Sequence, residues 1–469
     1  MTEQTNQTEE EFSLKTAVKF GTGQLSDIVA YQTFFFWIFT FYYTIVIRNT
    51  TLIAIPFIIW SVWNAFNDPI LGYLSDRTHT RWGRRIPWII AAIGPLSLIM
   101  FLLFSPPKTF GIDSVLVNFI YFFIIIIVFE LFYTMFSINQ TSLFPEQFID
   151  EVVRGKVNTV KQIFSVFGLI VAAILPSLFM KDPMVEESLP NWSIFGIFLA
   201  ALTFVFGFFF IKWGAKEKKE FREDYKEAPK IFKAIKLCVK SKSFRWYIPA
   251  EIANWFVYGM LPTIIPLYGR YVLGIEAGSM ELSILLGIGF ISAAIFINLW
   301  RWVAKKIGPR KAWMASLSTW ILTLLPFLFI SSFEEGLIFF FIMGIGLAGS
   351  MVLIDLIVSD IIDEDEVNTG IRREAAYYGV NALFLRFSTV FVFMAVGVVF
   401  AGFGWEEYDP IINDPDALVI ALKILMVALP AIAIAIGIIS LYKYPLDGEK
   451  LKQVKEKLKQ IHQEKKVKV

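Results

Sequence analysis

Apolar residues in this chain are grouped into blocks of about 20 residues, and these blocks restrict the possible folds more than any other feature. A helix of about 20 residues spans the ~30 Å hydrocarbon core of a bilayer. The chain is 56% hydrophobic and 18% charged, whereas a soluble globular domain is about 45 to 50% apolar and about 25% charged. We therefore predict a multi-pass integral protein of the cell membrane, made of transmembrane helices.

Twelve such blocks follow one another along the chain, and a long charged segment separates the sixth from the seventh. The predicted fold is all-α, with an N-terminal six-helix bundle at 1–213 and a C-terminal six-helix bundle at 246–444. A cytoplasmic connector at 214–245 joins the bundles, and a basic amphipathic tail follows at 445–469. The predicted spans are 25–47, 52–74, 86–105, 115–140, 157–180, 192–213, 246–273, 281–304, 312–332, 336–358, 375–401 and 417–443.

The charges of the loops predict the orientation in the membrane. Lysine and arginine in short loops stay on the cytoplasmic side. The loop after the second span contains Arg77, Arg81, Arg84 and Arg85, and alternate loops after it are also basic, whereas the opposite loops are mostly acidic or neutral. Both termini are therefore predicted to be cytoplasmic.

The tail has apolar residues at helical spacing, from Leu451 to Ile461, between many lysines. This pattern predicts a solvated helix along the cytoplasmic face. The alternative interpretation is a helix that recognises specific lipids.

Composition also excludes several kinds of site. Cys238 is the single cysteine, and His79 and His462 are the two histidines, both in polar segments. This excludes an intrachain disulfide and a cysteine metal cluster, and it argues against a histidine metal centre. We found no nucleophile with a neighbouring base and no phosphate-binding loop. We expect no cofactor, no metal beyond a Na+ ion, no nucleic-acid partner and a monomeric protein.

One stretch, Asn64 to Trp88, combines a carboxylate inside an apolar run with a basic loop directly after it. Asn64 and Asp68 are four residues apart, so they share one helix face. A charge at bilayer depth costs several kcal/mol, roughly 2.5 to 3.5 on insertion scales, and is usually functional. Asp68 is therefore predicted to carry a coupling cation. The alternative is a structural partner for a buried positive charge.

The same stretch carries a recognisable motif. Gly72, Asp76 and Arg77 are followed by Gly83-Arg84-Arg85 between two spans, and this pattern resembles the major facilitator superfamily. The longer strings NDPILGYLSDRTHTRWGRRIPW and DIIDEDEVNTGIRREAAYYG resemble the glycoside/pentoside/hexuronide:cation symporter family, which includes the melibiose carrier. The resemblance covers the whole membrane domain. It implies alternating-access transport of sugars or related solutes with H+ or Na+, and relatives carry sucrose or lysophospholipids.

The resemblance assigns the cation-coupling residues. It places the acidic residue of the first helix on Asp27, and the acidic pair of the second helix on Asn64 and Asp68. An amide thus stands where the melibiose carrier has a carboxylate. A Na+ site needs several hard oxygen ligands, whereas one buried carboxylate is enough to bind a proton. We therefore favour H+ over Na+ as the coupling ion.

The resemblance also assigns residues that contact the solute. Ser137 matches the position of the sugar-binding aspartate of the melibiose carrier, and Thr141 matches a neighbouring tryptophan. Lys161 matches an arginine of that carrier, and Arg386 matches a lysine. Arg386 lies near the predicted midplane and needs a carboxylate partner, with Asp68 and Asp27 as the candidates. That bridge is either static or broken during transport. Lys161 either contacts the solute or extends to the membrane interface.

Glu130 is a mid-membrane acid that matches no acidic position of the melibiose carrier. It is seven residues before Ser137, so both lie on one helix face, with Thr134 between them. Glu130 is either a substrate ligand of this branch or a buried neutral acid in the helix packing. Further polar residues at suitable depth are predicted to bind the solute: Tyr31, Gln140, Asn254, Tyr258 and Asn381.

Charged residues near the predicted cytoplasmic ends of the helices suggest an inner gate that opens and closes as the two halves rock. The alternative is charge that is simply solvated in loops. The predicted gate residues are Asp76, Arg77, Arg84, Arg85, Asp360, Asp363, Arg372 and Arg373.

Together these features predict a secondary active transporter, not an enzyme, that moves a sugar, glycoside or related solute with a cation. The alternative cargo is a lysolipid or another amphiphile. A membrane sensor on the same scaffold and an intramembrane enzyme are the competing classes. The enzyme would need two carboxylate pairs that grip Mg2+, and Asp68 and Asp76 are eight residues apart.

Overall fold

The computed structural model describes residues 12–78, 80–148, 151–217, 236, 238–276, 280–369 and 374–467. Five residues named above lie outside this part of the chain or have side chains that are not described: the gate residues Asp76, Arg372 and Arg373, and the two histidines, His79 and His462. Most of the predicted connector also lies outside it.

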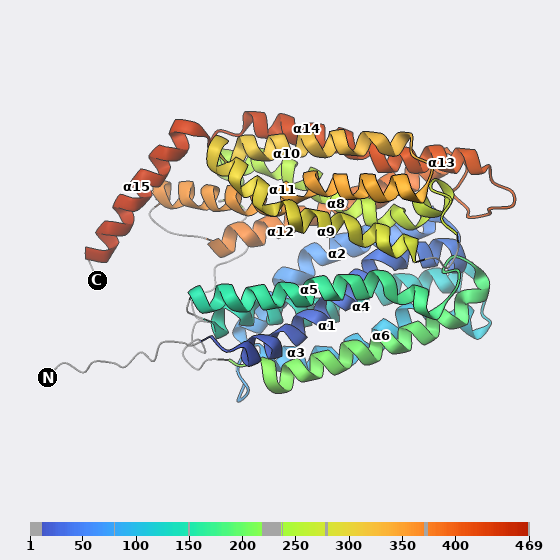
Figure 1. Ribbon diagram of the computed structural model, residues 1–469. Coiled ribbons are helices and arrows are strands. Elements are labelled where there is room, and N and C mark those ends of the chain that lie inside the picture. Colours follow the sequence, from blue (N-terminus) through green and yellow to red (C-terminus); the bar gives the residue numbers. More distant parts are fainter. Residues whose placement is uncertain are drawn as a thin grey trace. The chain divides into compact units, whose positions relative to one another are not determined.

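Within the described ranges the chain is helical, and no β-strand is formed there beyond two isolated bridges. Helices overlie each of the predicted spans. They are α1 (Leu14–Phe41), α2 (Thr50–Arg77), α3 (Ile86–Leu103), α4 (Val115–Gln147), α5 (Glu151–Phe179), α6 (Leu189–Phe209), α8 (Lys242–Tyr271), α9 (Glu281–Ile307), α10 (Pro309–Leu324), α11 (Phe333–Thr369), α12 (Glu374–Gly402), α13 (Pro415–Lys423) and α14 (Leu429–Lys443), with α15 (Gly448–Val467) in the tail (Figure 1).

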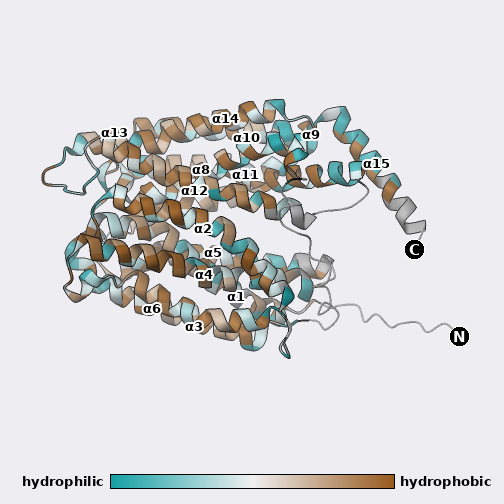
Figure 2. Ribbon diagram, turned by 180° about the vertical axis from the view of Figure 1, so that it is seen from behind, coloured by the Kyte–Doolittle hydropathy of each residue, from teal (hydrophilic) through white to brown (hydrophobic). Residues whose placement is uncertain are grey.

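Ten helical segments in the described residues are long and apolar enough to cross a membrane. Figure 2 shows hydrophobic residues along the lengths of these helices. The predicted spans in α8 and α10 are not among the ten, and α10, with 16 residues, is shorter than a full span. The chain is a multi-pass helical membrane protein. The number of twelve spans and the side of the termini stay predictions.

Contacts divide the chain into two compact units. The first unit contains Met1–Ile38, Asn67–Phe179 and Leu189–Ala228, and therefore most of α1, the second part of α2, and α3 to α6. In its core, the glycine face of α6 approaches α3 closely. A Cβ atom on Gly196 would lie 3.0 Å from the backbone oxygen of Phe101.

The second unit contains Phe39–Phe66, Met180–Ser188 and Pro229–Val469. The N-terminal part of α2 packs on α12 within this unit, where the rings of Phe57 and Phe393 stack with centroids 3.7 Å apart. Tyr43 donates a hydrogen bond to the carbonyl of Trp405, over 2.5 Å. The guanidinium of Arg48 donates to the carbonyl of Tyr408.

The tail forms α15, which lies beside the end of α11 in the second unit (Figure 1). Its apolar spacing predicts a helix, and the structure confirms this. Val454 and Leu458 are buried, with 7% and 9% of their surface exposed, so the helix covers part of its own unit. Figure 2 shows a mixture of hydrophilic and hydrophobic residues along α15.

Candidate functional site

Two carboxyl groups in the first unit lie on either side of one hydroxyl group. The Oγ1 atom of Thr134 is 3.0 Å from Oδ1 of Asp68 and 3.2 Å from Oε1 of Glu130. Glu130 is fully buried and Thr134 is 2% exposed. Asp68 comes from α2, whereas Thr134 and Glu130 are one turn apart on α4. The arrangement places a buried acid and a partly buried acid close together.

Two amide side chains of α2, Asn67 and Asn64, lie close to Asp68 along the helix. Asn67 donates from Nδ2 to the backbone carbonyl of Glu130, over 3.3 Å. Asn64 lies one turn before Asp68 on the same helix and is fully buried. Neither its amide nitrogen nor its amide oxygen has a hydrogen-bond partner among the described residues. Asn64 thus offers an unused oxygen on the face of α2 that carries Asp68.

Asp27 occupies a second position in the first unit, on α1. Its side chain is 6% exposed, and Ser137 of α4 is one of the polar groups that act on it. The hydroxyl of Tyr133 lies 3.4 Å from that of Ser137, and its ring stacks on Tyr31 with centroids 4.8 Å apart. The charge of Lys161 on α5 acts on Asp27. The predicted residues Asp27, Ser137, Lys161 and Tyr31 are therefore brought together.

Three further residues of the first unit that are predicted to bind the solute differ in burial and in contacts. Lys161 is half-buried, and its ammonium lies 5.1 Å from the centre of the Phe144 ring. Gln140 is buried and donates to Gln24 over 3.4 Å. Thr141 is exposed.

The second unit contains a different acid, Glu251 on α8, which is 1% exposed. Its Oε1 atom accepts from the indole of Trp255 over 3.0 Å and from the amide of Asn381 over 3.4 Å. Asn254 is also buried, and its amide oxygen has no partner among the described residues. Of the predicted solute ligands, Asn381 is therefore a partner of Glu251. A single sequence offers little sign of this, because the two residues are 130 positions apart.

Tyr258 and Arg386 are the remaining predicted residues. Tyr258 of α8 lines a small apolar crevice of about 30 Å³ together with residues of α9, α10 and α11. Arg386 is half-buried on α12. Its pairing with Asp68 or Asp27 stays a prediction.

Comparison with known protein families identifies the family of this chain. The model of the family "MFS/sugar transport protein" matches residues 19–448, which is most of the chain. The chain belongs to this family. The predicted resemblance to the major facilitator superfamily and its sugar:cation symporters is confirmed, and the helical fold agrees with it.

Three curated relatives of this transporter are distant from it in sequence. An uncharacterized symporter of Synechocystis is 21% identical over 93% of this chain and 95% of its own length. The sodium-dependent lysophosphatidylcholine symporter 1 of mouse is 22% identical over 86% of this chain and 80% of its own. The lactose permease of Lactobacillus delbrueckii is 25% identical over 79% of this chain and 60% of its own.

Solved structures support the fold. The crystal structure of the nucleoside transporter NupG superposes with a TM-score of 0.67, covering 92% of this transporter and 100% of that chain, at 13% identity. At this level of identity the similarity concerns the fold alone.

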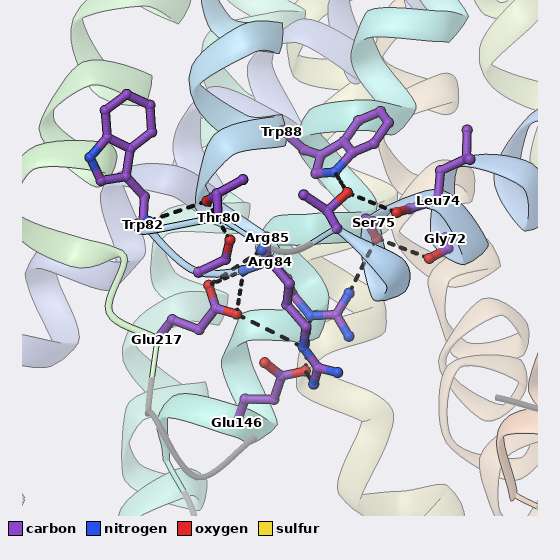
Figure 3. A network of polar contacts seen from close by, with 12 residues as sticks. Gly72, Leu74, Ser75, Thr80, Trp82, Arg84, Arg85, Trp88, Glu146 and Glu217 are labelled. Carbon is purple, nitrogen blue, oxygen red and sulfur yellow. Dashed lines mark hydrogen bonds and ion pairs between the residues drawn. The ribbon is translucent and has the colours of Figure 1, made fainter. Parts of the chain in front are cut away.

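The basic loop of this transporter forms a buried charge network inside the first unit (Figure 3). Arg84 and Arg85 are each 7% exposed, and both donate to the same oxygen of Glu146, over 2.9 Å each. The backbone N–H groups of both arginines donate to the carboxylate of Glu217, which thereby caps the start of α3. Sequence reasoning missed both acids, because Glu146 and Glu217 are 61 and 132 positions from Arg85.

Gly83 permits this network. Its φ is +103°, in the left-handed region that favours glycine, and a Cβ atom there would lie 2.0 Å from Oε2 of Glu217. The glycine of the Gly-Arg-Arg motif therefore leaves space for the carboxylate that binds the two arginine N–H groups.

The predicted gate residues Asp360 and Asp363 hold a lysine of the tail. Nζ of Lys455 lies 2.6 Å from both carboxylates. Partial burial alone would lower the pKa of Lys455, but hydrogen bonds and the charges of both aspartates outweigh this and raise the pKa above its usual 10.5. Next to this contact, Lys450 pairs with Glu364 over 2.7 Å. Two lysines of α15 therefore offset part of the negative charge at the end of α11.

Proposed function

We propose that this protein is a secondary active symporter that couples uptake of a sugar or glycoside to a cation, with H+ as the ion. Asp68 carries the proton, and Asp27 contributes the second acidic position. Arg386 is the proposed charge partner, released from its carboxylate when the proton binds. The two halves then alternate between access to one side of the membrane and to the other.

The observation that carries the proposal is the hydroxyl of Thr134 between Asp68 and Glu130. A hydroxyl has one hydrogen, so it can donate to only one of the two carboxylates at a time. Two negative charges on either side of one hydroxyl group disfavour each other. A proton added to one of the two carboxylates removes the repulsion. The protonated carboxyl group can then donate a hydrogen bond to the hydroxyl of Thr134. Membrane acids with this property mark proton pathways.

The chemistry of the solute side fits a sugar. Ser137, Tyr133 and Lys161 present hydroxyl and ammonium groups around Asp27, and a polyhydroxylated solute can both donate to a carboxylate and accept from such donors. The lactose permease relative supports this class of solute. Tyr31, stacked on Tyr133, adds an aromatic surface on which the apolar face of a sugar can pack.

Uptake into proteoliposomes tests the proposal. Lactose, raffinose and a β-glucoside are offered one at a time, with an imposed proton gradient or an imposed Na+ gradient. We expect one of these sugars to accumulate with the proton gradient, and the accumulation to collapse on addition of a protonophore. Accumulation that needs Na+ and ignores the protonophore would overturn the choice of ion.

A lysolipid is the second candidate cargo. The mouse relative is a lysophosphatidylcholine symporter, and the crevice beside Tyr258 is lined almost wholly by apolar residues of α8 to α11. In the same vesicles, gradient-driven uptake of lysophosphatidylcholine without uptake of any sugar would favour this candidate.

A further inference from the structure

Glu251 is a buried acid of the second unit that the proposed cycle does not use. It is 1% exposed, and it has no ion-pair partner among the described residues. The groups that donate to it, the indole of Trp255 and the amide of Asn381, are both neutral. A buried carboxylate without a positive partner is strongly unfavourable, and such a group binds a proton or another cation instead.

The titratable groups around Glu251 add no positive charge. Tyr247, one turn earlier on α8, is a neutral neighbour whose hydroxyl has no hydrogen-bond partner among the described residues, and Asp355 of α11 is a second acid that acts on Glu251. α12 contributes the uncharged Asn381. α14 packs on α8 through small apolar groups, at Gly437 against Ala250 and Ala253. None of the groups that act on Glu251 carries a positive charge.

The buried polar atoms around Glu251 that have no hydrogen-bond partner are consistent with a proton on its Oε2 atom. Both neutral donors act on Oε1, whereas Oε2 is buried and has no hydrogen-bond partner among the described residues. The same is true of the amide oxygens of Asn254 and Asn381. A proton on Oε2 turns an unsatisfied acceptor into a donor, and the buried amide oxygens are acceptors for it.

We infer that Glu251 is a proton-binding site of the second unit, built by Trp255 and Asn381 and chemically separate from Asp68. A proton suits it better than Na+ because the site offers one carboxylate, and no group of three or more acidic, histidine or cysteine side chains that could hold a metal occurs in the described residues. The presence of this proton does not depend on the proposed function. Release of the proton during transport would depend on the proposed function.

Infrared difference spectroscopy of the purified protein in liposomes tests the inference without any solute. Protonated carboxyl groups in apolar surroundings give a carbonyl band that carboxylates lack. We expect the wild-type protein to lose part of this band when the pH is raised from about 5 to about 9, and Glu251→Gln to lack that part of the change. Glu334→Gln, at an exposed position of α11, is the matched control and should behave as the wild type does.

Chemical labelling keeps the inference testable if the variant does not fold. A hydrophobic carbodiimide adds to a protonated carboxyl group in apolar surroundings and rearranges to a stable N-acylurea, which mass spectrometry locates. In the wild-type protein we expect Glu251 to be labelled at low pH and protected at high pH. Failure of Glu251 to react at any pH, together with identical spectra of wild type and Glu251→Gln, would overturn the inference. Loss of the carbonyl band on adding Na+ at constant pH would overturn the choice of a proton.

The outcome is distinguishable from failure of the proposed function. Asp68→Asn should leave the Glu251 part of the band in place. A protein that shows the Glu251 proton but accumulates no solute in a gradient would contradict the proposed symport and leave this site standing.

Discussion

Asp27 and Glu251 are both buried acids, but the two units compensate them in different ways. In the first unit, the charge of Lys161 acts on Asp27. In the second unit, Glu251 is surrounded by neutral donors and another acid. A positive charge nearby favours the charged form of a buried carboxyl group, whereas neutral or acidic surroundings favour its neutral form. The comparison teaches that substitution by a neutral side chain should cost much stability where the acid balances a positive charge and little where it does not.

The basic loop is the strongest example of paired charge. Arg84 and Arg85 share Glu146 and Glu217 within the first unit (Figure 3). The following predictions use this contrast and run from the largest expected effect to the smallest.

Replacement of Asp68 tests the carboxyl pair of the first unit. Asp68→Asn removes the group that we propose carries the proton, while the amide can still accept from Thr134. We expect gradient-driven accumulation of the selected sugar to fall to the level of empty vesicles, with exchange of solute across the membrane retained. Uphill uptake at the wild-type rate would count against the role of Asp68.

Replacement of Glu146 breaks a paired site. Glu146→Gln removes the negative charge that balances two buried arginines, and we expect a loss of about 3 kcal/mol in the free energy of unfolding. Chemical unfolding in detergent micelles measures the change. The exposed Glu334→Gln should change stability by less than about 0.5 kcal/mol. Equal stabilities of the two variants would show that the network adds little.

Replacement of Gly83 displaces the acid that caps α3. Gly83→Ala forces a side chain into the left-handed region and onto Glu217, so we expect a loss of about 2 kcal/mol. Gly72→Ala is the control, because a Cβ there meets nothing within 4 Å and alanine favours the helix. If both variants were equally stable, the close approach of Glu217 would be unimportant.

Replacement of Lys455 releases the tail from α11. Lys455→Met should cost about 0.5 to 1 kcal/mol, because the lysine is partly exposed, while Lys452→Met at an exposed position should cost less.

The docking of α15 should also depend on pH. Since contact with Asp360 and Asp363 raises the pKa of Lys455 above 10.5, its contribution is complete below about pH 10.5 and is lost as the pH rises through the raised value. Distances between spin labels on α11 and α15 report the docking. Release of α15 already near pH 8 would contradict this account.

Replacement of Glu251 should have the smallest effect on stability. Glu251→Gln reproduces the shape of the neutral acid and can still accept from Trp255 and Asn381, so we expect a change of less than about 0.5 kcal/mol. A loss as large as that of Glu146→Gln would mean that Glu251 is charged and paired, and the contrast between the units would fail.

The sequence predicts the helices and the acids well, because both depend on local pattern. Apolar blocks of about 20 residues mark membrane helices, and Asp68 and Glu130 stand out as charges inside them. The helical spacing of Leu451, Val454 and Leu458 also predicts α15 correctly.

The sequence does not predict which distant side chains meet. Glu217 approaches Arg84 across 133 positions, and Asn381 approaches Glu251 across 130. Such contacts depend on how the helices pack against one another. A single sequence contains no periodic pattern that shows which helices pack together. The partners of the predicted gate residues, Glu146 for the arginines and Lys455 for Asp360, were missed for the same reason.

Proton movement driven by solute is the most direct test of the central claim. Liposomes that contain the protein and a pH-sensitive dye receive an inward gradient of the selected sugar, with no ion gradient imposed. The account predicts that the lumen acidifies as the sugar enters the wild-type vesicles, and that Asp68→Asn vesicles take up sugar without acidification. Sugar entry without any change of pH in the wild type would contradict proton-coupled symport.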